Sequence, residues 1–304
     1  MNKKIRGFVL ALVGGIFWGF SGCCGQYLFQ VKQLDSNWLS CVRILTSGLM
    51  LIAISLIFQR KNFFAALRCR KDFLRILCFG VFGLMLCQLS YLTAIKHTNA
   101  ATATVIQYVG PVLVMLTVCL MRRRRPTVLE TVSVCLAVLG TFLIATHGNP
   151  SNMVISQKGL VWCIIAALTV VSYTLIPGAV TAKYSGVVVN AYGMTAGGIV
   201  LLFAFRAWQI PVSLDAAAVL AIAGIVIIGT VAAFTMYLQA VSDIGPIKAS
   251  IIASIEPISS AVISALWLKS RFEAIDLLGF VMIISTVIIC RVGDFNKKQT
   301  SEKS

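Results

Sequence analysis

Two stretches of the sequence align on each other without a gap: YLTAIKHTNAATATVIQYVGP at residues 91–111 and YLQAVSDIGPIKASIIASIEP at residues 237–257. Six of the 21 aligned positions are identical, and the last of them is a proline. A long internal match of this kind predicts that the chain is built from two similar halves. The identical pairs are Tyr91 with Tyr237, Leu92 with Leu238, Ala94 with Ala240, Ala103 with Ala249, Ile106 with Ile252 and Pro111 with Pro257.

The composition places most of the chain in lipid. Of its 304 residues, 59% are hydrophobic and only 12% are charged, and the mean hydropathy is +0.92, far above the value of a soluble domain. A helix needs about 20 mostly apolar residues to cross a bilayer, and long apolar runs without strict alternation favour helices over barrel strands. The sequence therefore predicts an all-α polytopic membrane protein with ten transmembrane helices. The expected spans are residues 7–29, 38–58, 73–95, 99–121, 128–146, 159–180, 186–206, 216–240, 245–268 and 275–292.

The repeat extends over both halves in the same order. GFVLALVGG at residues 7–15 resembles GLVWCIIAA at 159–167, and RILTSGLML at 43–51 resembles YGMTAGGIV at 192–200. Five spans in each half is an odd number, so the second half must cross the membrane in the opposite sense to the first. This arrangement is the inverted-topology repeat of alternating-access carriers. The expected division is a first repeat at 1–147, a second repeat at 158–292 and a charged, disordered cytoplasmic tail at 293–304.

The net charge of +16 lies on alternate loops and not on one surface. If the N-terminus is cytoplasmic, 17 Lys and Arg residues lie on the inner segments and six on the outer loops. The positive-inside rule then predicts that both termini are cytoplasmic. The RRRR run at residues 122–125 is explained as a topology signal, the alternative being a site for anionic lipid, so the charge does not indicate a nucleic-acid partner.

The two matched prolines mark the expected centre of the protein. Pro111 and Pro257 fall near mid-membrane, where a proline removes a backbone hydrogen bond and bends the helix. A carbonyl freed in lipid must be satisfied by neighbouring protein or by a water-filled cavity. Glu256 stands beside the second proline, while Gly110 occupies the equivalent place in the first half. We therefore expect a central cavity between two bends, with one acidic group in it.

These segments resemble the EamA family of the drug/metabolite transporter superfamily. The resemblance rests on TNAATATVIQYVGP and GPIKASIIASIEP, on the five-plus-five arrangement and on the short basic loop after the fourth span, and it covers nearly the whole chain. Membership implies a multi-pass carrier of the bacterial cytoplasmic membrane. In that family the usual activity is export of metabolites, amino acids or toxic compounds.

Glu256 and Arg43 are the charged candidates for substrate binding. An ionisable group deep in a span is costly and tends to be functional. Glu256 is expected to bind a cationic group or to carry a coupling proton, the alternative being an internal ion pair with Lys248. Arg43 is expected to hold a carboxylate or phosphate, the alternative being that its long side chain snorkels to the membrane surface.

Aromatic and amide side chains complete the predicted lining of the cavity, as in most small-molecule pockets. The alternative for each is an ordinary hydrogen bond between helices or an anchor at the membrane interface. The first choices are Trp18, Gln88, Gln107, Tyr91 and Tyr237. A wider set comprises Ser21, Gln26, Tyr108, Tyr173, Tyr192 and Gln239.

Nothing in the sequence calls for a cofactor or a metal. The ten cysteines fall mostly within spans without a CxxC pair, and His97 and His147 have no carboxylate at ligand spacing in the sequence. No GxxxxGK[ST] pattern is present, so a gradient of protons or of the substrate is the expected energy source. We expect a secondary active transporter, with a small-molecule substrate, the lipid bilayer and protons as its partners. An integral-membrane enzyme, a channel and a scaffold remain the alternatives.

Overall fold

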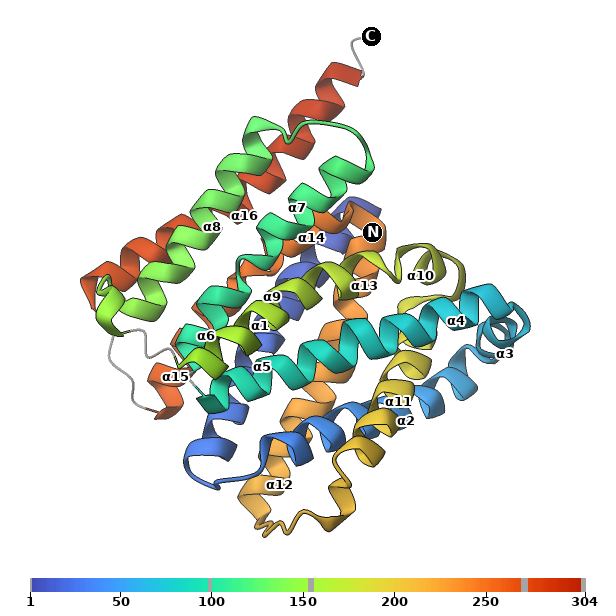
Figure 1. Cartoon of the computed structure of the whole chain (residues 1–304). Helices are drawn as coiled ribbons and strands as arrows, with labels where there is room; N and C mark the ends of the chain where they lie inside the picture. Colours follow the sequence, from blue (N-terminus) through green and yellow to red (C-terminus); the bar gives the residue numbers. More distant parts are fainter. Residues whose placement is uncertain (1, 98–99, 153–155, 269–272, 302–304) are drawn as a thin grey trace.

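The structure is a computed structural model that describes residues 2–97, 100–152, 156–268 and 273–301. Every regular element in these residues is helical, as expected for a chain whose backbone must satisfy its own hydrogen bonds in lipid (Figure 1). The prediction of an all-α fold is confirmed. The helices of the first half are α1 (Lys3–Gln30), α2 (Ser36–Phe58), α3 (Arg60–Arg68), α4 (Arg70–Cys78), η1 (Phe79–Met85), α5 (Leu86–His97), α6 (Ala100–Gln107), α7 (Gly110–Met121), α8 (Val128–Thr146) and η2 (Pro150–Asn152).

The second half has the same order of long helices but differs in its short elements, such as α10 (Gly178–Tyr184), which lies between its first two long helices. Its helices are α9 (Gln157–Leu175), α10 (Gly178–Tyr184), α11 (Gly186–Ala204), η3 (Ala207–Gln209), α12 (Ala216–Ala223), η4 (Gly224–Ala232), α13 (Ala233–Ile244), α14 (Pro246–Ile252), η5 (Ala253–Ile255), α15 (Glu256–Leu268) and α16 (Ala274–Ser301).

Seven helical stretches of the described residues are long and apolar enough to cross a membrane. Three shorter apolar helices occupy places where further spans are expected from the sequence: Gly110–Met121, Val128–Leu143 and Ala274–Thr286. The seven long stretches are Lys3–Gln30, Ser36–Phe58, Arg70–His97, Gln157–Leu175, Gly186–Ala204, Ala216–Ile244 and Pro246–Trp267.

The two halves interlock through their first helices. α1 packs against η4, α13 and α15, which belong to the second half, while α9 packs against η1, α5 and α7 of the first half. Each half therefore contributes one helix to the core of the other. α2 pairs with α11, and α8 pairs with α16, so these contacts also join equivalent helices of the two halves (Figure 1).

Small residues permit the close contact of α2 with α11. A methyl group added to Gly48 would lie 2.5 Å from the backbone nitrogen of Thr195, and one added to Gly198 would lie 2.7 Å from the Cα of Leu45. Helices in lipid gain their association energy from such close packing, since the lipid tails are as apolar as the side chains.

A π-helix interrupts the third span of each half. η1 lies between α4 and α5, and η4 lies between α12 and α13. In the alignment that pairs Tyr91 with Tyr237, η1 falls within the limits of η4. π-Helices are rare and frequently occur at functional sites. Their equivalent placement is structural support for the internal repeat, independent of the matched residues.

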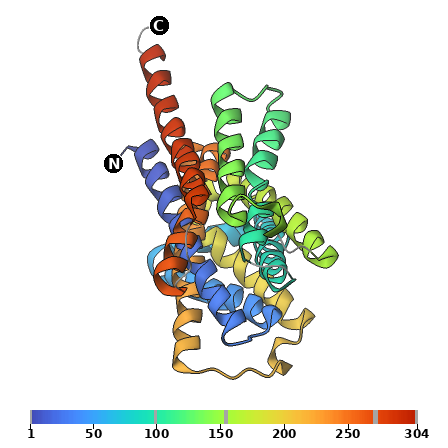
Figure 2. The same ribbon diagram turned by 90° about the vertical axis from the view of Figure 1, so that its left-hand side faces the viewer.

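The N-terminal part of α1 and the C-terminal part of α16 lie at the same end of the molecule (Figures 1 and 2). The backbone of α16 continues as a helix to Ser301. The helix thus extends past residue 292, where the last expected span ends, into the charged segment. Residues 302–304 lie outside the described part of the chain.

At this end an ion pair joins α1 to α13. Nε and Nη2 of Arg6 donate to the two carboxylate oxygens of Asp243, each at 2.8 Å, and Gln239 donates to Oδ1 at 2.9 Å. The Asp243 side chain is only 4% exposed, so its charge depends on these partners.

We expect Arg6→Gln and Asp243→Asn each to lower the melting temperature of the purified protein. The double variant should have a melting temperature no lower than that of the less stable single variant, because either substitution alone already breaks the ion pair between Arg6 and Asp243. Thermal unfolding of the four proteins in detergent measures this. Additive losses would contradict a direct contribution from the pair.

Candidate functional site

Both predicted bends coincide with interruptions of the helix. In the first half α6 ends at Gln107 and α7 begins at Gly110, with Pro111 in its first turn. In the second half α14 passes through the 3₁₀ turn η5 into α15, which begins at Glu256 and has Pro257 in its first turn. Proline suits a first helical turn because the amide hydrogen it lacks has no partner there.

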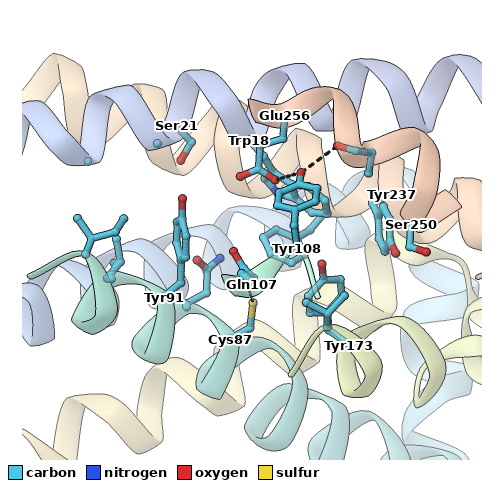
Figure 3. Close-up of a pocket in the computed structure, with 18 of the residues that line it drawn as sticks. Trp18, Ser21, Cys87, Tyr91, Gln107, Tyr108, Tyr173, Tyr237, Ser250 and Glu256 are labelled. Atoms are coloured by element: carbon cyan, nitrogen blue, oxygen red, sulfur yellow. Dashed lines mark hydrogen bonds between the residues drawn. The ribbon is translucent and has the colours of Figure 1, made fainter. Parts of the chain in front are cut away.

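A cavity lies beside these two interruptions, between the halves (Figure 3). It holds about 760 Å³ of space not filled by atoms, part of it open to solvent. Both halves contribute to its walls. The first half supplies residues of α1, α2, α5, α6 and α7, and the second half supplies residues of α9, α13, α14, η5 and α15. All seven residues proposed from the sequence to bind substrate line it: Trp18, Arg43, Gln88, Tyr91, Gln107, Tyr237 and Glu256.

The carboxylate of Glu256 is held by a tyrosine from the first half. The Tyr108 hydroxyl lies 3.0 Å from Oε2 of Glu256 and 3.2 Å from the carbonyl oxygen of Ala253, contacts drawn as dashed lines in Figure 3. Tyr108 follows α6 directly, so the two helix interruptions meet at this bond. Glu256 and Lys248, the partner considered in the sequence analysis, line different cavities.

Arg43 is buried and turned inward, with 5% of its surface exposed. Its Nε donates to the Thr230 hydroxyl at 2.7 Å and its Nη2 to the Gly229 carbonyl at 3.3 Å. Both acceptors belong to the π-helix η4. The guanidinium therefore lines the central cavity and does not reach toward a membrane surface.

Four aromatic rings form one wall of the cavity. The Trp18 ring lies 5.0 Å from the rings of Phe234 and Tyr237 and 6.2 Å from that of Tyr173, centroid to centroid. Edge-to-face and tilted contacts of this kind stabilise a rigid apolar surface. The Tyr237 hydroxyl is in turn 3.0 Å from that of Thr174.

Polar side chains also line the cavity. The Tyr91 hydroxyl lies 2.9 Å from the Thr104 hydroxyl, and the Gln107 amide lies 4.0 Å from the sulfur of Cys87. Within the described residues, three buried polar atoms of the cavity have no hydrogen-bond partner: Nε1 of Trp18, Oγ of Ser21 and Nε2 of Gln88. Such atoms are rare in native structures, and a ligand or water is the usual explanation.

The wider set of residues divides between the cavity and other places. Ser21, Tyr108 and Tyr173 line it, as does Pro111, whereas Pro257 does not. Tyr192 instead stacks on Phe63, with ring centroids 4.6 Å apart, and Gln239 bonds Asp243. The sequence reasoning missed Cys87, Phe234 and Ser250, which also line the cavity. The repeat offered a signal for Phe234, because it is the aligned counterpart of Gln88.

A second, more polar cavity lies at the end opposite the termini. Ile95 lines both cavities, so they lie next to each other. The lining of the second cavity includes Gln26, Lys32, Asp35, Lys96 and Arg206.

No group of three or more His, Cys, Asp or Glu residues in the described ranges could hold a metal ion. His147 does have a carboxylate partner in space, since its Nδ1 lies 2.9 Å from both oxygens of Asp276.

An ion pair between Lys32 and Asp215 stabilises the rim of this cavity. Asp215 also caps α12 by accepting from the Ala218 amide at 2.8 Å. The bond from Lys32, with that from Ala218, lowers the pKa of the Asp215 carboxyl from its ordinary value of 3.8. A lowered folded-state pKa means that the stabilisation is present above about pH 4 and is lost as the pH falls through the lower, folded-state value.

We expect Asp215→Asn to lower the melting temperature slightly at pH 7, because asparagine keeps the cap but loses the ion pair. Asp215→Ala should lower it further. The difference between wild type and Asp215→Asn should shrink at pH 3, which a series of thermal unfolding curves would measure. A difference independent of pH would contradict the electrostatic explanation.

A helical membrane protein with a central cavity between two interlocked, similar halves has the architecture of a small-molecule transporter. Sequence comparison agrees: the chain belongs to the EamA-like transporter family, which matches residues 5–146 and 157–292. The family and the names of the relatives identify a multi-pass membrane transporter and not an enzyme.

Two bacterial proteins illustrate the relationship. The chain is 36% identical over 289 residues to the uncharacterized inner membrane transporter YicL of Salmonella typhimurium, covering 95% of this chain and 96% of that protein. It is 25% identical over 208 residues to the uncharacterized transporter YcbK of Bacillus subtilis, covering 66% of each. A solved crystal structure has the same fold, with a TM-score of 0.75 at 14% identity, covering 95% of this chain and 96% of the other.

Proposed function

We propose that this protein is a ten-span secondary active transporter that exports small metabolites, amino acids or drugs across the bacterial cytoplasmic membrane. The observation that carries the proposal is the cavity between the halves, where Glu256 and Tyr108 meet at two matched helix interruptions. Seven long apolar helices and three shorter ones at the expected places support ten spans. The distribution of Lys and Arg supports cytoplasmic termini.

Alternating access follows from the interlocked halves. We take residues 1–147 and 158–292 as the two repeats, each of which contributes its first helix to the other. We take the end that holds the termini as the closed one, since contacts such as Arg6 with Asp243 join the halves there, and the opposite end, whose cavity shares Ile95 with the central one, as the open one. Rocking of one half against the other would exchange these two arrangements. Pro111 and Pro257 are the proposed points of bending.

Glu256 is the proposed site of proton coupling. It is the acidic residue among those lining the central cavity, and the Tyr108 hydroxyl can donate to its ionised form. A carboxyl group that binds either a proton or a substrate group can couple the two movements, because the membrane span contains few other sites for a proton.

The test of function is the extracellular metabolite profile of bacteria that express the protein, compared with cells that express Glu256→Ala at equal membrane abundance. A compound that accumulates outside only with the intact protein would support export and identify its substrate. Identical profiles would contradict export through this cavity.

Counterflow in liposomes separates the proposal from its alternatives. A carrier exchanges labelled for unlabelled compound against the gradient, whereas an enzyme converts the compound and a channel only equilibrates it. The compound identified by the metabolite profile is the one to use. Equilibration without counterflow would contradict a carrier mechanism.

A further inference from the structure

In the described part of the chain, the buried guanidinium of Arg43 contacts no carboxylate, although Glu256 lines the same cavity and interacts with it electrostatically over a longer distance. A guanidinium has five N–H donors, and the hydrogen bonds of Arg43 go to two neutral oxygens, those of Thr230 and Gly229. Among the described residues, no carboxylate lies within 4.0 Å of it, because the ion pairs found there involve other basic groups. A buried charge is stable only when it is paired and hydrogen-bonded. Because Glu256 does not contact the guanidinium, a direct partner for it is expected to come from a bound ligand.

Unpaired polar atoms accompany Arg43 in the same cavity. Nε2 of Gln88 and Oγ of Ser21 are buried without partners, and their residues are each only 3% exposed. Ser21 is close to Arg43, because it packs directly on Gly229, whose carbonyl accepts from the guanidinium. An amide nitrogen can only donate, and a hydroxyl can donate as well as accept. The site thus offers donors and needs acceptors.

On the proposed transport function, we infer that the substrate is a small organic monocarboxylate whose carboxylate binds Arg43, Gln88 and Ser21. The aromatic wall of Trp18 and Tyr237 then receives its apolar part. Arginine binds carboxylates in a bidentate manner, and a carboxylate has enough lone pairs for all three side chains. A doubly charged phosphate fits less well. The lining offers it the single positive charge of Arg43, and the carboxyl group of Glu256 in the same lining would repel the second negative charge.

Three probes of one shape test this inference: 3-phenylpropionate, 3-phenylpropanamide and 3-phenylpropylamine. Binding to the purified full-length protein in detergent is measured by calorimetry. We expect the carboxylate to bind at least about tenfold more tightly than the amide and the amine, as for a charge-assisted bond in a buried site. Arg43→Gln should remove that preference while changing the affinity for the amide by less than about threefold.

Gln88→Leu provides a second variant in case Arg43→Gln fails to fold. It should weaken carboxylate binding by roughly threefold or more, because one hydrogen bond is lost. Arg60→Gln is the matched control, since Arg60 is an exposed arginine outside the cavity, and its affinities should equal those of the wild type. Tightest binding of the amine, no measurable binding of the carboxylate, or a preference that survives both cavity substitutions would overturn the inference. Counterflow of another compound with no carboxylate preference would leave the transport function standing while rejecting this substrate class.

Discussion

Replacing Glu256 by glutamine is expected to reduce proton-driven transport about tenfold or more, without loss of folding. Glutamine keeps the size of the side chain and an oxygen that can accept from Tyr108, so the change removes only the charge and the titratable proton. Charged groups at this depth are costly and are retained for function. The measurement compares transport driven by a pH gradient with simple exchange in the same proteoliposomes.

If Glu256 carries the proton, the gradient-driven rate should fall far more than the exchange rate. Tyr108→Phe should have an intermediate effect, because it keeps the carboxyl group and removes its hydrogen bond. Glu130→Gln is the matched control: Glu130 pairs with Arg124 at 2.8 Å and lines a different cavity. Equal gradient-driven rates for wild type and Glu256→Gln at every pH would disprove the coupling role.

The second large effect is expected at a glycine that faces Glu256. A methyl group added to Gly19 would lie 2.7 Å from both the Glu256 carbonyl oxygen and the Ser260 nitrogen, and it would collide with the Ser259 hydroxyl. Because two of these atoms are backbone, α1 would have to move away from α15. We expect Gly19→Ala to destabilise the protein by about 1–3 kcal/mol, the usual cost of overpacking, and to displace Glu256 from its position.

Gly22→Ala is the control on the same helix. Its added methyl group would lie 3.9 Å from the Ser260 and Tyr91 hydroxyls, which is an ordinary contact distance. Alanine favours a helix over glycine, so this variant should be as stable as the wild type or slightly more stable. Melting temperature and transport rate should both fall for Gly19→Ala only. Similar values for the two variants would contradict the close packing of α1 on α15.

The sequence predicts the central features of this fold because they depend on local chemistry. Matched prolines mark helix interruptions wherever they occur, and an acidic group in an apolar run must find a polar site. The seven residues proposed to bind substrate converge on one cavity for the same reason: polar and aromatic side chains within spans avoid lipid. Pro257 lies just outside its lining, since it follows Glu256 on the next face of α15.

Other features depend on packing between the halves and have no local signal. The exchange of α1 and α9 between the two cores is one, and the pairing of Tyr108 with Glu256 across 148 residues is another. Phe234 looks like any apolar residue of a span; its alignment with Gln88 is the one signal in the sequence, and its contact with Trp18 appears only in the structure. The partners of Arg6 and His147 are likewise distant in sequence.

The paired π-helices have a consequence for how the third span of each half should be aligned and engineered. A π-turn adds a residue relative to an α-turn, and one residue corresponds to about 100° of rotation around an α-helix. The faces before and after η1 therefore follow two separate helical phases, and so do those around η4. A helical wheel drawn through the whole span would put Tyr91 or Tyr237 on the wrong side. Deleting a single residue in η1 should convert the π-turn to an α-turn and leave Gln88 and Tyr91 facing the cavity, whereas the same deletion in a regular α-helix would rotate every residue beyond it.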